Sequence, residues 1–205
     1  MKITGTLAFL CLLAACCSNK AKEQNRYEQY AVKKRPDTTT IYATSTFLLK
    51  SGTIPDSVFQ MDQLRVLSIT GMDCDYREHD ENGKDITQCW SVHEISPKIG
   101  NLVNLETLWL PQNNIAELPE TMNQLQRLKI IDLTDNTTLR KIDVLTQLPA
   151  LEELYLYGCQ LTRLPENIGA LRNLKRLGLN GNYLSDEEKE RITKALPGCA
   201  FVFSQ

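Results

Sequence analysis

The sequence lacks most of the features by which enzymes, membrane-spanning proteins and nucleic-acid-binding proteins are recognised. It contains two histidines and no HExxH, GxSxG, phosphate-loop or CxxC motif, so no catalytic or metal site is expected. Its 23 basic and 25 acidic residues give a net charge of -2, without the basic excess that nucleic-acid binding requires. The apolar run from Leu7 to Leu13 is too short to span a bilayer. We therefore expect a protein that is not an enzyme, uses no cofactor and has no nucleic-acid partner.

What the sequence does contain is a set of leucine columns with a period of 23 residues. The first column is Leu102, Leu125, Leu148 and Leu171, the second is Leu105, Leu128, Leu151 and Leu174, and the third is Leu110, Leu133, Leu156 and Leu179. A small polar column keeps the same step, with Asn113, Asn136, Cys159 and Asn182. A fixed period of this length is typical of a solenoid in which each repeat contains a short strand and a turning segment.

The residues within one repeat predict how its side chains point. In residues 105–110 the leucines alternate with other residues, as in a half-buried strand, so Leu108 and Leu110 should point inward and Trp109 outward. The turn after each strand leaves backbone groups without partners, and a buried side-chain amide can pair with them. We assign this role to the asparagines of the polar column. Cys159 is expected to be a small buried substitute with a weak donor.

The repeating unit LPxxIxxLxxLxxLxLxxNxL, over roughly residues 61–184, resembles the leucine-rich repeat family. The match is to the 23-residue class of bacterial proteins and of plant intracellular and Ras-associated repeat proteins. The resemblance implies an α/β fold, a right-handed β-α superhelix with a parallel concave sheet that usually binds another protein, and it brings no catalytic residues. After the repeats, Ser185 and three acidic residues predict a capping box and a helix toward Leu196. Residues 200–203 predict a final strand that caps the sheet.

The first 40 residues differ from the repeats in composition. Residues 1–15 have the apolar centre of a signal peptide, and Leu13-Ala14-Ala15-Cys16 resembles a bacterial lipobox, which makes Cys16 the expected lipidation site. An ordinary signal peptide is the alternative. Residues 16–40 are polar and predict a tether to a repeat domain at 41–205. Within the tether, Thr38 lies in a sequence that resembles a Bacteroidetes O-glycosylation acceptor.

These features predict a lipid-anchored protein of the bacterial cell envelope. Several acyl chains hold a protein far more firmly than one myristoyl chain does, so no transmembrane helix is needed. The outer membrane is the expected location, and the sequence does not specify whether the protein faces the periplasm or the exterior.

One repeat is interrupted by an insertion. The distance from Met61 to Leu102 is 41 residues, 18 more than one period, and the excess lies in an inserted hairpin predicted at 73–93. If residues 80–83 form a four-residue loop, His79 faces Lys84 and, in the same register, two cysteines lie opposite one another.

The cysteines of this hairpin predict a disulfide. Cys74 and Cys89 would face each other in a compartment that permits oxidation. A metal site made by these cysteines with His79 and His93 is the weaker alternative, because the spacings match no common zinc pattern. Outside the hairpin, Cys199 is expected to be a buried free thiol, and a bridge from it to Cys159 stays open.

The outward positions of the strands predict one binding patch. Neighbouring strands lie about 4.7 to 4.9 Å apart, so three aromatic side chains from two repeats should flank an acidic pair in the repeat between them. Exposed tryptophan and tyrosine are enriched where proteins recognise partners. The expected protein-binding residues are Trp109, Asp132, Asp135, Glu153, Tyr155, Tyr157 and Arg176.

The predicted function is protein recognition by a monomer through the concave face. The aromatic residues are also compatible with simple cross-strand stabilisation of the sheet, and with a purely structural envelope protein. A third alternative is a glycan-binding accessory protein in which Trp109, Tyr155 and Tyr157 stack on sugar rings. Hydrolysis by Asp132 and Asp135 is not expected, because nothing on an open strip would raise the pKa of one carboxyl group.

Overall fold

The computed structural model describes residues 40–44, 52–71, 73–79, 81–83 and 85–203. All of them belong to one unit, Val32–Gln205. The predicted signal peptide, the expected lipidation site Cys16 and the expected glycosylation site Thr38 lie outside the described residues.

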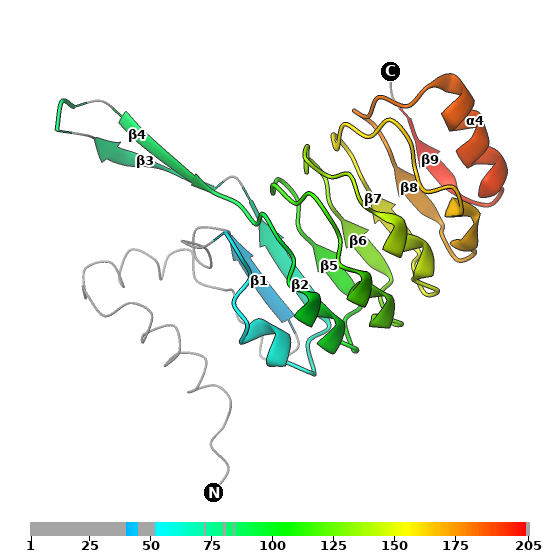
Figure 1. Ribbon diagram of the computed structural model, residues 1–205, viewed down its shortest axis with the longest axis horizontal. Helices are drawn as coiled ribbons and strands as arrows, with labels where there is room; N and C mark the ends of the chain where they lie inside the picture. The colour runs from blue at the N-terminus through cyan, green and yellow to red at the C-terminus, as the bar shows by residue number, and fades with distance from the viewer. Residues whose placement is uncertain (1–39, 45–51, 72, 80, 84, 204–205) are drawn as a thin grey trace, which may run out of the picture. The chain divides into compact units, whose positions relative to one another are not determined.

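Seven parallel strands form one sheet in the order in which they occur along the chain (Figure 1). They are β1 (Thr40–Thr44), β2 (Val66–Thr70), β5 (Thr107–Trp109), β6 (Ile130–Asp132), β7 (Glu153–Tyr155), β8 (Arg176–Gly178) and β9 (Ala200–Val202). Sequential order is what a solenoid produces, because each coil adds one strand beside the previous one. The predicted parallel-sheet solenoid is therefore confirmed, and β1 is an additional strand that the leucine columns did not predict.

Short 3-10 helices carry the chain from one strand to the next. They are η2 (Val58–Gln60), η3 (Pro97–Asn101), η4 (Glu120–Gln124), η5 (Asp143–Gln147) and η6 (Ile168–Ala170). The last four each end at a residue of the first leucine column, which provides the C-cap. Pro97 begins η3 and Pro119 precedes η4. Proline suits these positions because a helix start does not use its missing N–H donor.

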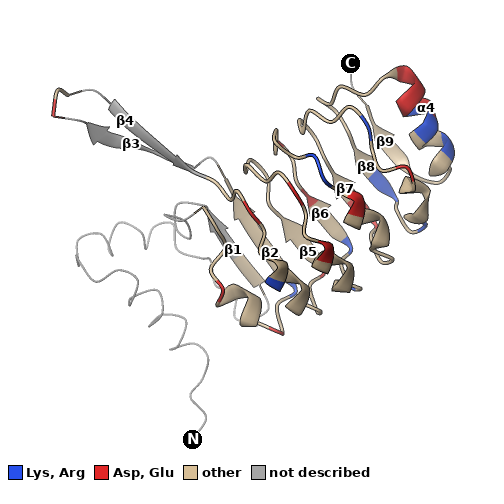
Figure 2. Cartoon of the chain, viewed as in Figure 1, with Lys and Arg blue, Asp and Glu red and all other residues tan. Residues whose placement is uncertain are grey.

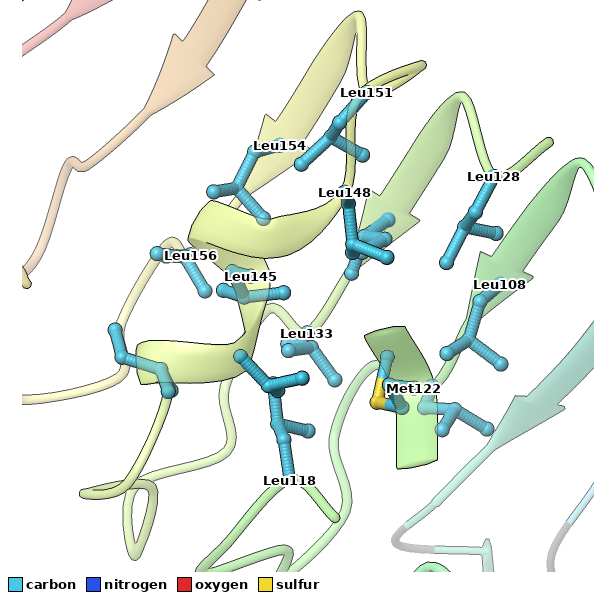
Figure 3. Packing of buried hydrophobic residues seen from close by; sticks show 14 of the residues in the cluster. Leu108, Leu118, Met122, Leu128, Leu133, Leu145, Leu148, Leu151, Leu154 and Leu156 are labelled. Atoms are coloured by element: carbon cyan, nitrogen blue, oxygen red, sulfur yellow. The ribbon is translucent and has the colours of Figure 1, made fainter. Parts of the chain in front are cut away.

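The leucine columns form one continuous core between the strands and the 3-10 helices (Figure 3). Every member of the three columns is at most 5% exposed, and Leu108, Leu128, Leu133 and Leu154 are fully buried. Burying a leucine stabilises the fold by about 1.5 to 3 kcal/mol, so the stack holds together through apolar contacts between successive coils.

The asparagines of the polar column make the predicted contacts with the backbone. Asn136 donates from Nδ2 to the carbonyl oxygen of Leu110 at 2.8 Å and accepts at Oδ1 from the amide of Ile115 at 3.1 Å. Asn182 repeats this one period later, with Leu156 and Leu161 as partners. Each side chain thus joins its own turn to the preceding coil, as the sequence predicted.

Cys159 takes the place of asparagine in this column and keeps the hydrogen bond that the asparagine side chain donates to the preceding coil. Its thiol donates to the carbonyl oxygen of Leu133 at 3.1 Å, which lies 26 residues earlier, the same separation as for Asn136 and Asn182. Burial raises the pKa of the Cys159 thiol to about 12, so the sulfur stays protonated and remains a donor. Cys159 and Cys199 are both free, so the alternative bridge between them is wrong. Cys199 is half-buried rather than buried.

The insertion contains two antiparallel strands, β3 (Asp73–His79) and β4 (Asp85–Trp90). The ladder places Cys74 opposite Cys89, as predicted. It does not place His79 opposite Lys84: the register shifts by one residue between Asp75 and Glu78, and His79 faces Asp85. The sequence prediction used only the length of the hairpin loop, and loop length does not reveal an extra residue inside a strand. The side chains of β3 and β4 lie outside what the structure describes, so the disulfide stays a prediction.

The helix α4 (Asp186–Ala195) closes the last repeat. Acidic residues gather at its start and basic residues follow (Figure 2), which complements the helix dipole. Ser185 accepts from the amide of Glu188 at 3.2 Å, which confirms the predicted N-cap. The carboxylate of Glu188 instead reaches the preceding repeat, where it accepts from the amide of Leu164 at 2.8 Å.

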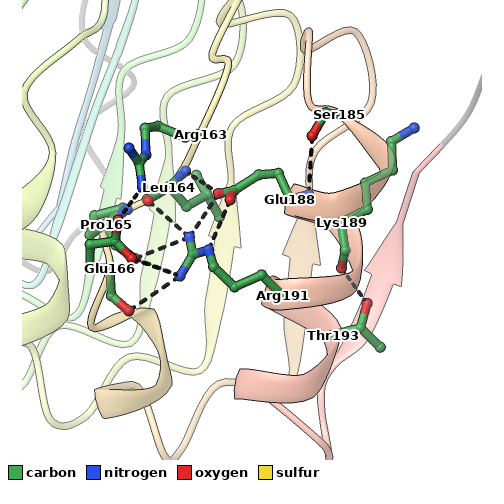
Figure 4. Close-up of polar contacts among 9 residues, drawn as sticks. All are labelled: Arg163, Leu164, Pro165, Glu166, Ser185, Glu188, Lys189, Arg191 and Thr193. Atoms are coloured by element: carbon green, nitrogen blue, oxygen red, sulfur yellow. Dashed lines mark hydrogen bonds and ion pairs between the residues drawn. The ribbon is translucent and has the colours of Figure 1, made fainter.

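Arg191 holds α4 against this repeat (Figure 4). Its guanidinium donates to both carboxylate oxygens of Glu188 and to the carbonyl oxygens of Leu164, Pro165 and Glu166. The Glu188 side chain is 11% exposed. The hydrogen bonds from Arg191 lower the pKa of Glu188 below its ordinary value, although burial opposes them.

We expect Glu188→Gln to lower the free energy of unfolding at neutral pH by about 2 kcal/mol, because a hydrogen-bonded charge is lost. A carboxyl group whose pKa is depressed by folding stabilises the protein above its unfolded pKa, near 4.3, and loses this contribution as pH falls. Urea unfolding of both proteins from pH 7 to pH 3 should therefore show a difference that shrinks with acidification. Glu190→Gln, on the exposed side of α4, is the control; an equal loss there, or a difference that ignores pH, contradicts the assignment.

Candidate functional site

The strand register brings the predicted outward residues into one row. Across β2 and β5 to β8 the paired positions are Ser68, Trp109, Asp132, Tyr155 and Gly178. A second row at the start of β5 to β8 contains Thr107, Ile130, Glu153 and Arg176. We call the outward residues of β5 to β8, with the turn residue Tyr157, the exposed sheet face.

Trp109 is the aromatic residue of this face with the largest exposed fraction. Its side chain is 38% exposed, although the neighbouring leucines on β5 and in the following turn, Leu108 and Leu110, are fully buried. Among the described aromatic residues, none stacks on its ring. An exposed tryptophan ring held on a rigid strand is a surface that a partner can cover at little conformational cost.

The two tyrosines are packed against each other and against the next strand. The rings of Tyr155 and Tyr157 are stacked, with centroids 5.8 Å apart and an interplanar angle of 22°. Tyr157 also lies over Gly178: a Cβ atom at that glycine would be 2.3 Å from Cζ of the tyrosine. Gly178 therefore makes room for the ring, and one side of this aromatic pair is occupied by the protein itself.

The edge of the face is held by a charged network. The hydroxyl of Tyr155 donates to Oε2 of Glu153 at 2.5 Å, and Arg176 forms an ion pair with Oε1. Burial raises the pKa of Glu153, but the hydrogen bonds from Tyr155 and Arg176 outweigh it and leave the pKa below its ordinary value. The same hydrogen bond to Glu153 raises the pKa of Tyr155, with burial adding to it. Glu153 is thus an ionised anchor for the tyrosine.

The acidic pair is less symmetrical than predicted. Asp132 is half-buried and accepts from the amide of Thr134 at 2.8 Å through Oδ1, which fixes its carboxylate. Asp135 has a φ of 59° and stands in the column of left-handed turn residues that continues at Gly158 and Gly181. Its position is therefore set by the turn. Only Asp132 is held on the strand row beside Trp109.

A set of ion pairs between neighbouring repeats was not predicted from the sequence. At the position before each strand the charges alternate along the stack: Arg65, Glu106, Lys129, Glu152 and Lys175. Arg65 and Lys129 both pair with Glu106, and Lys175 pairs with Glu152 at 2.6 Å. The alternating signs at the 23-residue period are the signal that would have revealed this ladder.

The chemistry of the exposed sheet face is that of a recognition surface. Aromatic rings, one fixed carboxylate and an ion-paired edge can bury area and select charge. In the part of the chain that the structure describes, no group of three His, Cys, Asp or Glu residues is placed to hold a metal ion. Within the same residues, no helix is long and apolar enough to cross a membrane.

Sequence comparison assigns the repeats to a family. The family described as "Leucine-rich repeat region" matches residues 57–201, which is most of the chain and includes the strands of the exposed sheet face. The chain belongs to this family. Leucine-rich repeat proteins are typically binding scaffolds without catalytic residues.

Two relatives are similar to part of this chain. Reticulon-4 receptor-like 2 of Rattus norvegicus is 45% identical over 64 residues, which cover 30% of this chain and 15% of that protein. Uridine 5'-monophosphate transferase of Xanthomonas campestris is 35% identical over 78 residues, which cover 38% of this chain and 15% of that enzyme. Because the chain spans so small a share of each relative, neither similarity transfers an activity.

Among solved structures, a leucine-rich repeat protein of Leptospira interrogans is similar over a longer stretch. It is 33% identical, with a TM-score of 0.61, and the match covers 73% of this chain and 34% of that one. The similarity supports the leucine-rich repeat fold over most of the chain.

The close approach of Tyr157 to Gly178 makes a testable prediction for this leucine-rich repeat protein. Gly178→Ala should displace the Tyr157 ring, break the stack on Tyr155 and cost about 1 kcal/mol in urea unfolding, with a change in near-ultraviolet circular dichroism. Gly198→Ala is the control, since a Cβ atom there meets nothing within 4 Å. In a Tyr157→Ala background the substitution at Gly178 should cost nothing; an undiminished cost would mean that the clash lies elsewhere.

Proposed function

We propose that this chain is a lipid-anchored protein of the bacterial envelope that recognises another protein through the exposed sheet face. The scaffold is of a kind commonly used for protein recognition, and the resemblance to its family implies that this face is concave. We propose that the chain acts as a monomer and without a cofactor.

The observation that carries the proposal is the exposed ring of Trp109 in the strand row, next to Asp132. Trp109 is 38% exposed, and Asp132 and Tyr155 occupy the next two strands beside it. Aromatic residues beside fixed polar groups are typical of binding hot spots.

The tyrosine contacts favour a protein partner over a glycan. A sugar ring stacks on an open aromatic plane, whereas Tyr157 covers Gly178 and its ring is stacked with that of Tyr155. The glycan-binding alternative needs three open rings on which sugars can stack. Of the three, only Trp109 has no other ring of the described aromatic residues stacked on it. An extended protein segment needs no such platform, because it can spread its contacts over several strands.

The proposal is tested by chemical crosslinking in intact envelopes, followed by pull-down of the tagged chain. The wild type should capture a defined partner that the double variant Trp109→Ala, Tyr155→Ala loses. Val103→Ala, which truncates an apolar side chain that is 49% exposed away from the exposed sheet face, is the control. The variants are compared only after urea unfolding shows matched stability. An unchanged capture profile overturns the assignment of this face, and capture of glycan instead of protein favours the alternative.

The lipid anchor is a separate part of the proposal. It is supported by the apolar run from Leu7 to Leu13 and by the small residues before Cys16. Metabolic labelling with a palmitate analogue should mark the wild type and not Cys16→Ser, and fractionation should find the labelled chain in the membrane pellet. Cys17→Ser is the matched control. Labelling that survives in Cys16→Ser would contradict the lipobox assignment, while the proposed binding face would stand.

A further inference from the structure

We propose that the exposed sheet face selects an arginine-bearing extended segment of its partner. The guanidinium of that arginine would lie against the ring of Trp109 and pair with the carboxylate of Asp132. This inference rests on the proposed function and adds to it the chemistry of the partner.

The first support is the distribution of charge over this face. The basic side chains at the start of the strands are already paired with carboxylates. The ion pairs are Arg65–Glu106, Lys129–Glu106, Lys175–Glu152 and Arg176–Glu153. Asp132 and Asp135 take part in no ion pair among the described residues. Asp132 is therefore a carboxylate without an ion-pair partner in the middle of the face, whereas the four basic side chains at the edge are already paired with three carboxylates.

The second support is the placement of Asp132. It stands directly beside Trp109 in the register of β5 and β6, and adjacent strands are about 4.8 Å apart. One planar cation can therefore touch both side chains. The amide of Thr134 donates to Oδ1 of the carboxylate at 2.8 Å, so the group is oriented before a partner arrives. Among the described residues, no donor bonds to Oδ2.

The third support is the match between these two groups and a guanidinium. Arginine is planar, stacks on an aromatic face and donates two parallel hydrogen bonds to a carboxylate. A cation placed over a tryptophan ring is attracted by the negative face of the ring. Lysine satisfies the charge but not the planar stacking, and an acidic or neutral side chain would leave Asp132 without a counter-charge. The site therefore discriminates among side chains by charge and by shape.

The test uses the full chain and a phage-displayed library of random nonapeptides. Wild-type protein should enrich peptides that contain arginine, compared with the same selection on Trp109→Ala. The best peptide is then synthesised with arginine or with its neutral isostere citrulline, and its affinity is measured by fluorescence polarisation. Replacement by citrulline should weaken binding by about tenfold or more.

Two substitutions separate a local pairing from a general charge effect. Asp132→Asn keeps an oxygen for the Thr134 amide but removes the charge, and it should weaken the arginine peptide by about tenfold while leaving the citrulline peptide unchanged. Glu152→Gln removes the same charge at the ion-paired edge and should change affinity by less than about twofold. Trp109→Leu, which keeps apolar area, should cost about three- to thirtyfold.

The outcomes distinguish this inference from the proposed function. Enrichment of peptides without arginine, or equal losses in Asp132→Asn and Glu152→Gln, overturns the arginine pairing; binding that still depends on Trp109 would leave the proposed function in place. No enrichment by the wild type over Trp109→Ala overturns both.

Discussion

The structure depends on one side-chain contact that is repeated in the coils of β5, β6, β7 and β8. An asparagine, or Cys159 in its place, joins the turn after a strand to a carbonyl oxygen of the preceding coil. Without it, backbone groups would be buried unpaired, at a cost of about 1 to 3 kcal/mol each. Because this contact recurs at a fixed step, it also locks the strands in register. The outward residue of one strand therefore lies beside the residue at the equivalent position of the next repeat.

That register turns separate residues into a surface. Trp109, Asp132 and Tyr155 are 23 residues apart in the sequence and adjacent in the sheet. The leucines and asparagines behind them specify the fold, while the outward residues are free to differ from repeat to repeat without disturbing the core. Recognition can thus be altered on this scaffold independently of stability, which is why the family alone does not name a partner.

The periodic part of the structure could be predicted from the sequence, and the aperiodic contacts could not. The leucine and asparagine columns predicted the core, the strands and the row containing Trp109 and Asp132. The one-residue shift that brings His79 opposite Asp85 depends on a bulge inside a strand, and the reach of Glu188 to Leu164 depends on the docking of α4. The contact of Tyr157 with Gly178 depends on the direction in which the tyrosine side chain crosses from one coil to the next, which the sequence pattern does not contain.

The central claim, that the exposed sheet face is the binding surface, is tested most directly by site-specific photocrosslinking in living cells. A photoreactive residue is placed either at Thr107, which points outward from β5, or at Glu120, at the start of η4 on the connecting side of the coil. We predict that the chain with the probe at position 107 forms a discrete adduct with another protein and that the chain with the probe at position 120 does not. Adducts from position 120 alone would contradict the account.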